Sequence, residues 1–188
     1  YKTIIYLVVI IKKLNNNYLS IYYTKLLYKM PSKNLYTCMR LSEDIQKHLH
    51  NYALEISKLH SNFVPMELNK LHMTFVFVGS KCSYKEADEI SNTVLNLPSD
   101  VYKFDSVRES FFPPGKKNLA VVLFKAPKNA VTARDSLACT LRVVESEWIP
   151  HVTLGKFVGK KSDFNIPQFP SYSFESDGIF VVNPYIIK

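Results

Sequence analysis

Two short motifs of the same form, each a histidine followed two positions later by a threonine, carry the clearest chemistry in the sequence. The first is His72-Met73-Thr74-Phe75 and the second is His151-Val152-Thr153-Leu154. Each motif opens an apolar stretch, and in a β-strand a residue and its i+2 neighbour lie on the same face. Two such strands facing each other would therefore present two imidazoles and two hydroxyl groups to one cleft.

These groups suit the cleavage of a phosphodiester. One imidazole can take a proton from the attacking oxygen while the other gives a proton to the leaving oxygen, because the ordinary pKa of histidine, about 6.5, lies near neutral pH. The threonine hydroxyls can donate to the non-bridging phosphate oxygens and stabilise the charge that builds there. We therefore predict that His72 and His151 are the acid and base and that Thr74 and Thr153 bind the phosphate. No metal ion and no cofactor is needed for this chemistry.

The remaining histidines have no such partner motif. His48, His50 and His60 lie on or beside a predicted helix, and we expect them to face solvent. A single histidine at the start of a strand is usually an ordinary polar residue, and threonine is an ordinary strand former. The prediction therefore depends on the repetition of the whole motif.

Strands and helices alternate along the chain and must position the two motifs. The expected strands are Leu35–Leu41, Leu71–Val78, Val101–Val107, Leu119–Phe124, His151–Phe157, Phe174–Ser176, Ile179–Val182 and Tyr185–Ile187. The expected helices run from Ser42 to His60, from Ser83 to Pro98 and over Asn129–Arg142. Several strands follow one another directly, which favours a mixed α+β fold over a doubly wound parallel sheet.

Local patterns support these elements. The first helix has an apolar stripe made of Ile45, Leu49, Tyr52, Ile56 and Leu59. Ser83 and Glu86 have the spacing of a capping box at the start of the second helix. Alternation along the strand of the first motif predicts one face with His72, Thr74 and Val76 and an opposite face with Met73, Phe75 and Phe77.

The composition is that of a globular protein, with 47% hydrophobic and 21% charged residues in a chain of 188. The net charge is +8, but the first thirty residues hold five lysines and no acidic residue. The remainder is only mildly basic, which suits a polyanionic substrate held at one place better than a surface that coats nucleic acid.

Residues 1–29 form a basic, tyrosine-rich extension, and we expect the domain over residues 30–188, with Met30 as a natural start. The extension could be appended sequence, a poorly ordered arm or a segment that lies on a membrane surface. Its apolar stretch Ile4–Ile11 is too short to span a bilayer.

Three cysteines, Cys38, Cys82 and Cys139, are widely spaced and follow no zinc-binding pattern. We expect reduced thiols in a cytoplasmic protein.

The paired motifs resemble the signature of the 2H phosphoesterase superfamily. Residues Phe63–Thr74 resemble the approach to the first motif in the LigT-like RNA 2′,3′-cyclic phosphodiesterases, and Trp148–Lys156 resemble the second motif. The segment Phe111–Phe124 is similar to their mid-chain loop and strand, and the resemblance extends from about Leu35 to Val182. Lys156 stands where those enzymes usually carry an arginine.

The resemblance implies two pseudo-symmetric lobes, each a small antiparallel sheet with outer helices, around a central groove. It implies an enzyme, expected to be a monomer without a membrane span, that acts on RNA 2′,3′-cyclic phosphate ends, 2′,5′-linked oligoadenylates or related nucleotide esters. Lys156 would hold the phosphate, with a plain surface lysine as the alternative, and Phe112 and Tyr185 would stack on a nucleobase, with core packing as the alternative. Val76 stands where many relatives have a lysine, which leaves the substrate open.

Two other classes of protein could also carry two histidines of this kind. A binding module could keep the groove and lose turnover, but both motifs are intact. A zinc hydrolase would need more ligands than two histidines without a nearby carboxylate or cysteine.

Overall fold

The computed structural model describes residues 34–79, 83–96, 101–113, 118–144, 147–159, 166–176 and 178–182. The extension over residues 1–29, Cys82 and the strand expected at Tyr185–Ile187 lie outside these ranges. The domain boundary at residue 30 and the role of Tyr185 therefore stay predictions.

The described strands form one antiparallel sheet. They are β1 (Leu35–Arg40), β2 (Phe63–Pro65), β3 (His72–Gly79), β4 (Lys103–Phe112), β5 (Leu119–Lys125), β6 (His151–Phe157), β7 (Ser173–Glu175) and β8 (Ile179–Val182). The order is β7-β4-β5-β6-β3-β1-β8, and β2 pairs with β6 outside this path. The predicted α+β class is confirmed.

The sheet narrows in its middle. β3 and β6 are joined by the single pair Met73–Val152, whereas the ladders on either side of this pair are longer. The sheet thus has two halves, one of β7, β4, β5, β6 and β2 and the other of β3, β1 and β8. The two lobes expected from the sequence are halves of one continuous sheet, and their pseudo-symmetry stays a prediction.

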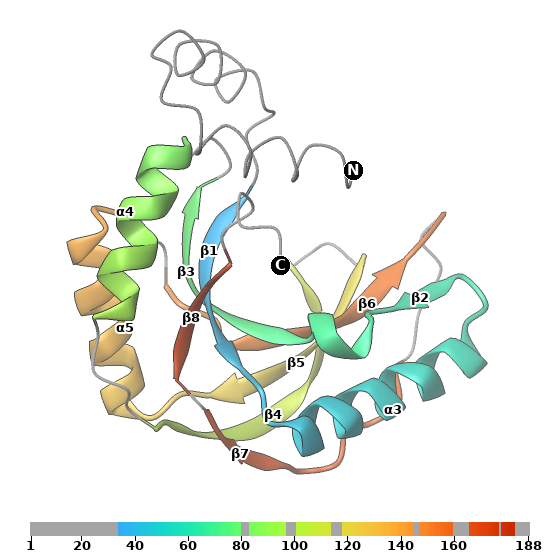
Figure 1. Cartoon of the computed structure of the whole chain (residues 1–188). Helices are drawn as coiled ribbons and strands as arrows, with labels where there is room; N and C mark the ends of the chain where they lie inside the picture. Colours follow the sequence, from blue (N-terminus) through green and yellow to red (C-terminus); the bar gives the residue numbers. More distant parts are fainter. Residues whose placement is uncertain are drawn as a thin grey trace, which may run out of the picture.

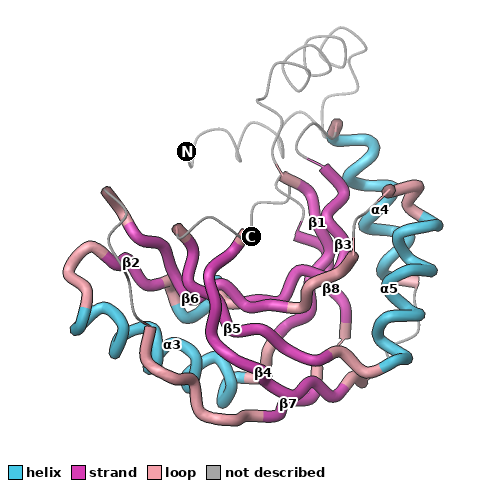
Figure 2. Tube along the Cα trace, turned by 180° about the vertical axis from the view of Figure 1, so that it is seen from behind, coloured by secondary structure: helices cyan, strands magenta, loops and turns pink. Residues whose placement is uncertain are grey.

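Each half of the sheet has its own helices. α3 (Glu43–Leu59) and the short 3-10 helix η1 (Leu68–Lys70) lie beside the half with β2 and β6. α4 (Tyr84–Leu95) and α5 (Lys128–Thr140) lie side by side against the other half, where α4 contacts β8 and α5 contacts β3 (Figures 1 and 2). Within the described residues no helix is long and apolar enough to cross a membrane.

Local sequence signals explain where the helices begin and which side they bury. Ser42 is the N-cap of α3, and the predicted stripe is buried at Ile45, Leu49, Tyr52 and Ile56. Its last member, Leu59, is 65% exposed because the helix ends there. The predicted capping box of α4 is confirmed: the Ser83 side chain accepts from the backbone N–H of Glu86, whose carboxylate accepts from the backbone N–H of Ser83.

Some elements extend beyond the sequence prediction or were missed. β4 continues to Phe112, so that Phe111 and Phe112 end a strand instead of starting a loop, because β5 pairs with β4 as far as Leu119. β2 and η1 were not predicted, since three residues give no periodic signal.

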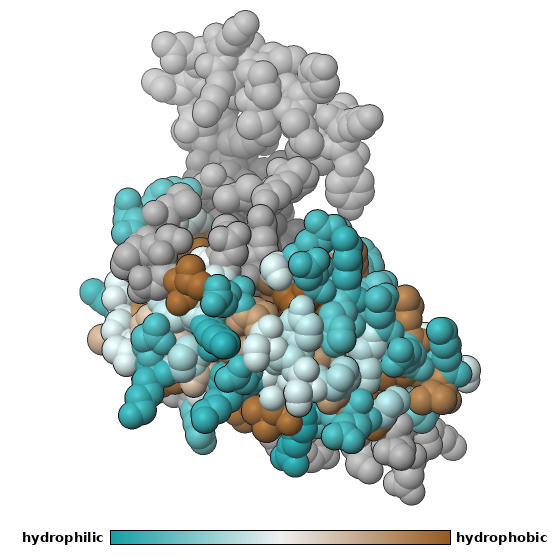
Figure 3. Space-filling view, turned by 90° about the horizontal axis from the view of Figure 1, so that it is seen from below, coloured by the Kyte–Doolittle hydropathy of each residue, from teal (hydrophilic) through white to brown (hydrophobic). Residues whose placement is uncertain are grey.

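Side chains from both halves join one hydrophobic core. Phe75 of β3 and Phe104 of β4 are both buried, and each meets the ring of Trp148 edge-on. Trp148 thus packs between the two halves. The underside of the molecule is mostly hydrophilic, with hydrophobic side chains scattered over it (Figure 3).

Candidate active site

The two motifs lie on adjacent strands at the joint of the sheet. Met73 pairs with Val152, and both side chains are fully buried on the core face. In an antiparallel pair the residues on either side of this position alternate to the opposite face. His72 therefore lies across from Thr153, and Thr74 lies across from His151, all four half-buried on one face. His72 and His151 are then diagonal neighbours, a relation that places the backbones of two residues about 7–8 Å apart.

A β-bulge follows the threonine of each motif. On β3, Phe75 is skipped in the pairing with β1, and on β6, Leu154 is skipped in the pairing with β5. Both skipped residues are buried. An extra residue of this kind shifts the alternation of the strand by one position. The side chains that follow each motif therefore face the opposite way from a regular strand.

The bulge on β3 overturns the faces predicted from simple alternation. Tyr36 and Cys38 are two positions apart on β1, so their partners Phe77 and Thr74 share a face. Phe77 is 45% exposed on the side of the motif, whereas Val76 is fully buried on the core side. The side chain of position 76 is thus directed into the core of this protein, away from the motif face.

The bulge on β6 directs Lys156 to the motif face. Thr153 and Lys156 pair with Val121 and Leu119, which are two positions apart on β5. Lys156 is exposed and so has room to meet an anion on this side. Phosphate binding by Lys156 stays a prediction, and the position of Lys156 on the motif face favours it.

Both motif histidines are held in the same way at one ring nitrogen. Nδ1 of His72 lies 2.8 Å from the carbonyl oxygen of Lys70, and Nδ1 of His151 lies 2.7 Å from that of Ile149. A carbonyl oxygen can only accept, so each Nδ1 carries a proton and donates. In the neutral ring, Nε2 is then left as the basic nitrogen.

An aromatic ring also lies against each imidazole. Tyr36 of β1 stacks on His72 with ring centroids 5.1 Å apart and planes inclined by 23°. Phe112, at the end of β4, stacks on His151 at 4.1 Å and 24°. The expectation that Phe112 stacks on a nucleobase stays a prediction, and the structure places its ring against a motif histidine.

The two histidines differ in electrostatic environment. Burial lowers the pKa of His151 below its ordinary value, and the hydrogen bond to the Ile149 carbonyl opposes this effect. The positive charge of His72 lowers the pKa of His151 further. His151 is therefore favoured in its neutral form near neutral pH, especially when His72 is protonated.

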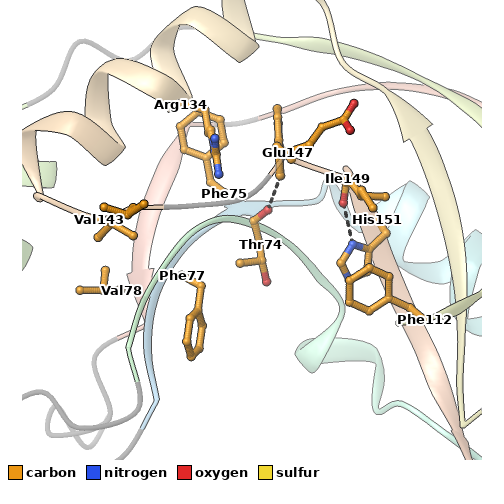
Figure 4. A pocket seen from close by; sticks show the side chains of 12 residues that line it. Thr74, Phe75, Phe77, Val78, Phe112, Arg134, Val143, Glu147, Ile149 and His151 are labelled. Atoms are coloured by element: carbon orange, nitrogen blue, oxygen red, sulfur yellow. Dashed lines mark hydrogen bonds between the residues drawn. The ribbon is translucent and has the colours of Figure 1, made fainter. Parts of the chain in front are cut away.

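A cavity of about 700 Å³ opens beside His151 and Thr74 (Figure 4). It lies between the C-terminal half of β3, helix α5 and the segment that leads into β6. Its lining is mostly apolar, with these side chains: Phe75, Phe77, Val78, Phe112, Val143, Val144, Trp148 and Ile149. Arg134 and Glu147 add charged groups. A volume of this size and character suits a small organic ligand.

Arg134 and Trp148 shape one side of this cavity. The Arg134 side chain is mostly buried, and its Nη1 donates to the Asp135 carboxylate at 2.9 Å. Trp148 donates from Nε1 to the carbonyl oxygen of Thr74 at 3.1 Å, a bond drawn in Figure 4. This bond attaches the segment before β6 to β3 and fixes where the second motif begins.

The three other histidines are not solvent-facing, so that prediction was wrong. His48 stacks on Tyr172 with centroids 4.7 Å apart, and its Nε2 is buried without a hydrogen-bond partner. His50 Nδ1 lies 3.0 Å from the Met66 carbonyl oxygen, and His60 packs edge-on against an aromatic ring of β6. The segment that precedes β7 covers α3, and sequence periodicity within α3 carries no information about that contact.

Sequence reasoning missed several residues around the site. Tyr36 and Phe77 lie on the motif face, and Arg134 and Glu147 line the cavity. None belongs to a motif, and only the pairing of distant segments brings them together. Among the residues that the structure describes, no group of three or more His, Cys, Asp or Glu side chains could hold a metal ion.

Solved structures share this arrangement of strands and helices. TT0787 of Thermus thermophilus matches with a TM-score of 0.62 and 14% identity over 79% of this chain and 86% of that chain. E. coli LigT complexed with 3′-AMP matches with a TM-score of 0.60 and 15% identity over 83% and 90% of the two chains. A further structure, described as a phosphoesterase, matches with a TM-score of 0.56 and 16% identity over 79% and 86%.

No protein-family model and no curated protein matches the sequence. The structural likeness establishes the fold: the chain has the LigT-like fold of the 2H phosphoesterases.

Proposed function

We propose that this protein is a metal-independent phosphodiesterase that uses His72 and His151 to hydrolyse 2′,3′-cyclic phosphate ends of RNA or related nucleotide esters. The observation that carries the proposal is the Met73–Val152 pair, since it gives both histidines and both motif threonines one common face. The LigT-like fold adds support, and E. coli LigT was solved in complex with 3′-AMP.

The unequal surroundings of the two histidines suggest their roles. His151, with its lowered pKa, acts as the base: its Nε2 takes a proton from the water whose oxygen attacks phosphorus. His72 acts as the acid and gives a proton to the ribose oxygen as the bond between that oxygen and phosphorus breaks. After one turnover, His151 has gained a proton and His72 has lost one. Proton exchange with solvent then returns both histidines to their starting protonation states.

Neighbouring side chains supply the remaining contacts. The hydroxyls of Thr74 and Thr153 donate to the non-bridging phosphate oxygens, where charge increases in the transition state. Lys156 adds a positive charge on the same side. Phe77, exposed on the motif face and in the lining of the cavity, offers a ring on which a base can stack.

A substrate panel in EDTA tests this proposal. It contains the four nucleoside 2′,3′-cyclic phosphates, an RNA with a cyclic phosphate end, and 2′,5′- and 3′,5′-linked oligoadenylates. We expect turnover of the cyclic phosphates in the presence of the chelator. Loss of all activity in EDTA, with recovery on addition of zinc or manganese, would contradict the chemistry.

The same panel separates the alternatives. Preference for the 2′,5′-linked oligoadenylate would make the protein a phosphodiesterase of that class. Binding of nucleotides in calorimetry, with no product from any member of the panel, would indicate a non-catalytic binding module.

A further inference from the structure

Each motif histidine is held from two directions. A backbone carbonyl binds Nδ1, and an aromatic ring lies nearly parallel to the imidazole plane. The two rings, Tyr36 and Phe112, come from β1 and from the end of β4, outside both motifs. The same pair of contacts thus occurs twice, built from unrelated segments of the chain.

The carbonyl alone does not fix an imidazole. A ring held only at Nδ1 can still tilt about that hydrogen bond, and the direction of Nε2 then varies. A stacked ring, here with planes inclined by 23° or 24° to the imidazole, opposes this tilt, because both planes must turn together. Proton transfer depends on the direction of the donor and acceptor as well as on their distance.

We propose that Phe112 and Tyr36 are positioning residues that clamp His151 and His72 in the orientation needed for proton transfer. This inference rests on the proposed function, in which the two histidines are the acid and base. It also gives Phe112 a role other than the expected stacking on a nucleobase. A centroid separation of 4.1 Å between Phe112 and His151 leaves no space for a base between the two rings.

The Tyr36 hydroxyl is not needed for this role. Burial, and to a lesser degree the Cys38 thiol, raises the pKa of Tyr36 above its ordinary value, so the phenol stays neutral near neutral pH. The contact with His72 is made by the stacked ring, so the proposed role uses the face of Tyr36. Two variants therefore differ in effect: Tyr36→Phe keeps the ring face, and Tyr36→Leu removes it.

Phe112 has a second effect on its partner. It covers one face of His151, and burial is the largest cause of the lowered pKa of that imidazole. The other charged groups near His151 come from three elements: His72 on β3, Arg134 on α5 and Glu147 in the segment before β6. Substitution of Phe112 leaves these three side chains unchanged, so a shift in the titration of His151 reports on the covering ring.

The first test is an NMR titration of the histidine ring signals in the full-length protein. Phe112→Leu should raise the pKa of His151 towards its ordinary value, and Phe112→Tyr should keep it low. Phe111→Leu is the matched control, since Phe111 is the adjacent residue of β4 and its ring meets Phe157 instead. The Phe111→Leu substitution should leave the pKa of His151 unchanged. Circular dichroism checks that each variant is folded.

The second test is kinetic and uses two substrates. One is a nucleoside 2′,3′-cyclic phosphate, and the other is glycerol 1,2-cyclic phosphate, which has no base. Phe112→Leu and Tyr36→Leu should lower kcat about 10- to 100-fold on both, as expected for a misplaced catalytic group, with little change in KM. Phe112→Tyr and Tyr36→Phe should keep most of the activity.

The outcomes discriminate between explanations. If Phe112→Leu raises KM for the nucleoside substrate alone and leaves the His151 titration unchanged, Phe112 contacts the base and the proposal is overturned. An unchanged kcat in the leucine variants would also overturn it. If the wild-type protein hydrolyses neither substrate, the proposed function fails, while the NMR titration still decides whether Phe112 controls the environment of His151.

Discussion

Replacing Gly155 by alanine should push β2 away from β6 and destabilise the protein. A Cβ atom at this position would lie 2.4 Å from the backbone oxygen of Val64, 2.5 Å from the Phe63 ring and 2.9 Å from the Cα of Pro65. Two of these neighbours are backbone atoms, which cannot rotate away, so β2 must retreat by about 1 Å to reach ordinary contact distances. Overpacking of a well-filled region typically costs about 1–3 kcal/mol.

Thermal unfolding followed by circular dichroism measures this cost. For a chain of this size, 1 kcal/mol corresponds to about 2–4 °C in Tm, so we expect a decrease of about 2–12 °C. Val64→Ala is the control, because it removes atoms from an exposed side chain of the same strand and adds none. It should change the free energy of unfolding by less than about 0.5 kcal/mol. A Gly155→Ala variant as stable as the wild type would refute the close approach of β2 to β6 at Gly155.

Three further predictions concern the site and its surroundings. Thr74→Val and Thr153→Val should each lower kcat about 10- to 100-fold in steady-state assays, because a hydrogen bond to a charged group contributes about 1.5–3 kcal/mol; unchanged rates would exclude the hydroxyls as phosphate donors. Because the pKa of His151 is lowered and its neutral form is the base, kcat/KM should rise with pH through a pKa below about 6.5, and a rise centred above that value would argue against this assignment. His48→Ala should leave kcat unchanged and reduce the free energy of unfolding by about 0.5–1.5 kcal/mol, the value of an aromatic pair, in urea denaturation. Loss of kcat in a folded His48→Ala protein would indicate a role at the site that its position does not explain.

The chemistry of the motifs could be predicted from the sequence because it depends on local spacing. A histidine and its i+2 threonine share a face in any strand, so the repeat alone predicted the common face that the Met73–Val152 pair now supports. The capping box at Ser83 and Glu86 was predictable for the same reason, since all its atoms lie within four consecutive residues.

The bulges could not be predicted from this spacing. Whether Phe75 or Leu154 is skipped depends on the neighbouring strand and its register, and both are remote in sequence. Period-two alternation therefore placed Val76 and Phe77 on the wrong faces. It gave no indication that Lys156 shares the face of the second motif.

Contacts between distant segments of the chain also could not be predicted from the sequence. Tyr36 reaches His72 from β1, and Phe112 reaches His151 from the end of β4. The burial of His48 likewise depends on the segment before β7. Each of these contacts arises from the curvature and order of the sheet, which no local pattern encodes.

The central claim is that His72 and His151 act as one acid–base unit, and its most direct test is the turnover of a nucleoside 2′,3′-cyclic phosphate by single and double variants. His72→Ala and His151→Ala should each lower kcat by ~10²–10⁴-fold in EDTA, with circular dichroism spectra like that of the wild type. The double variant should be little worse than either single one, because both groups serve the same transition state. Near-full activity in either single variant would contradict the account, and so would losses that multiply in the double variant.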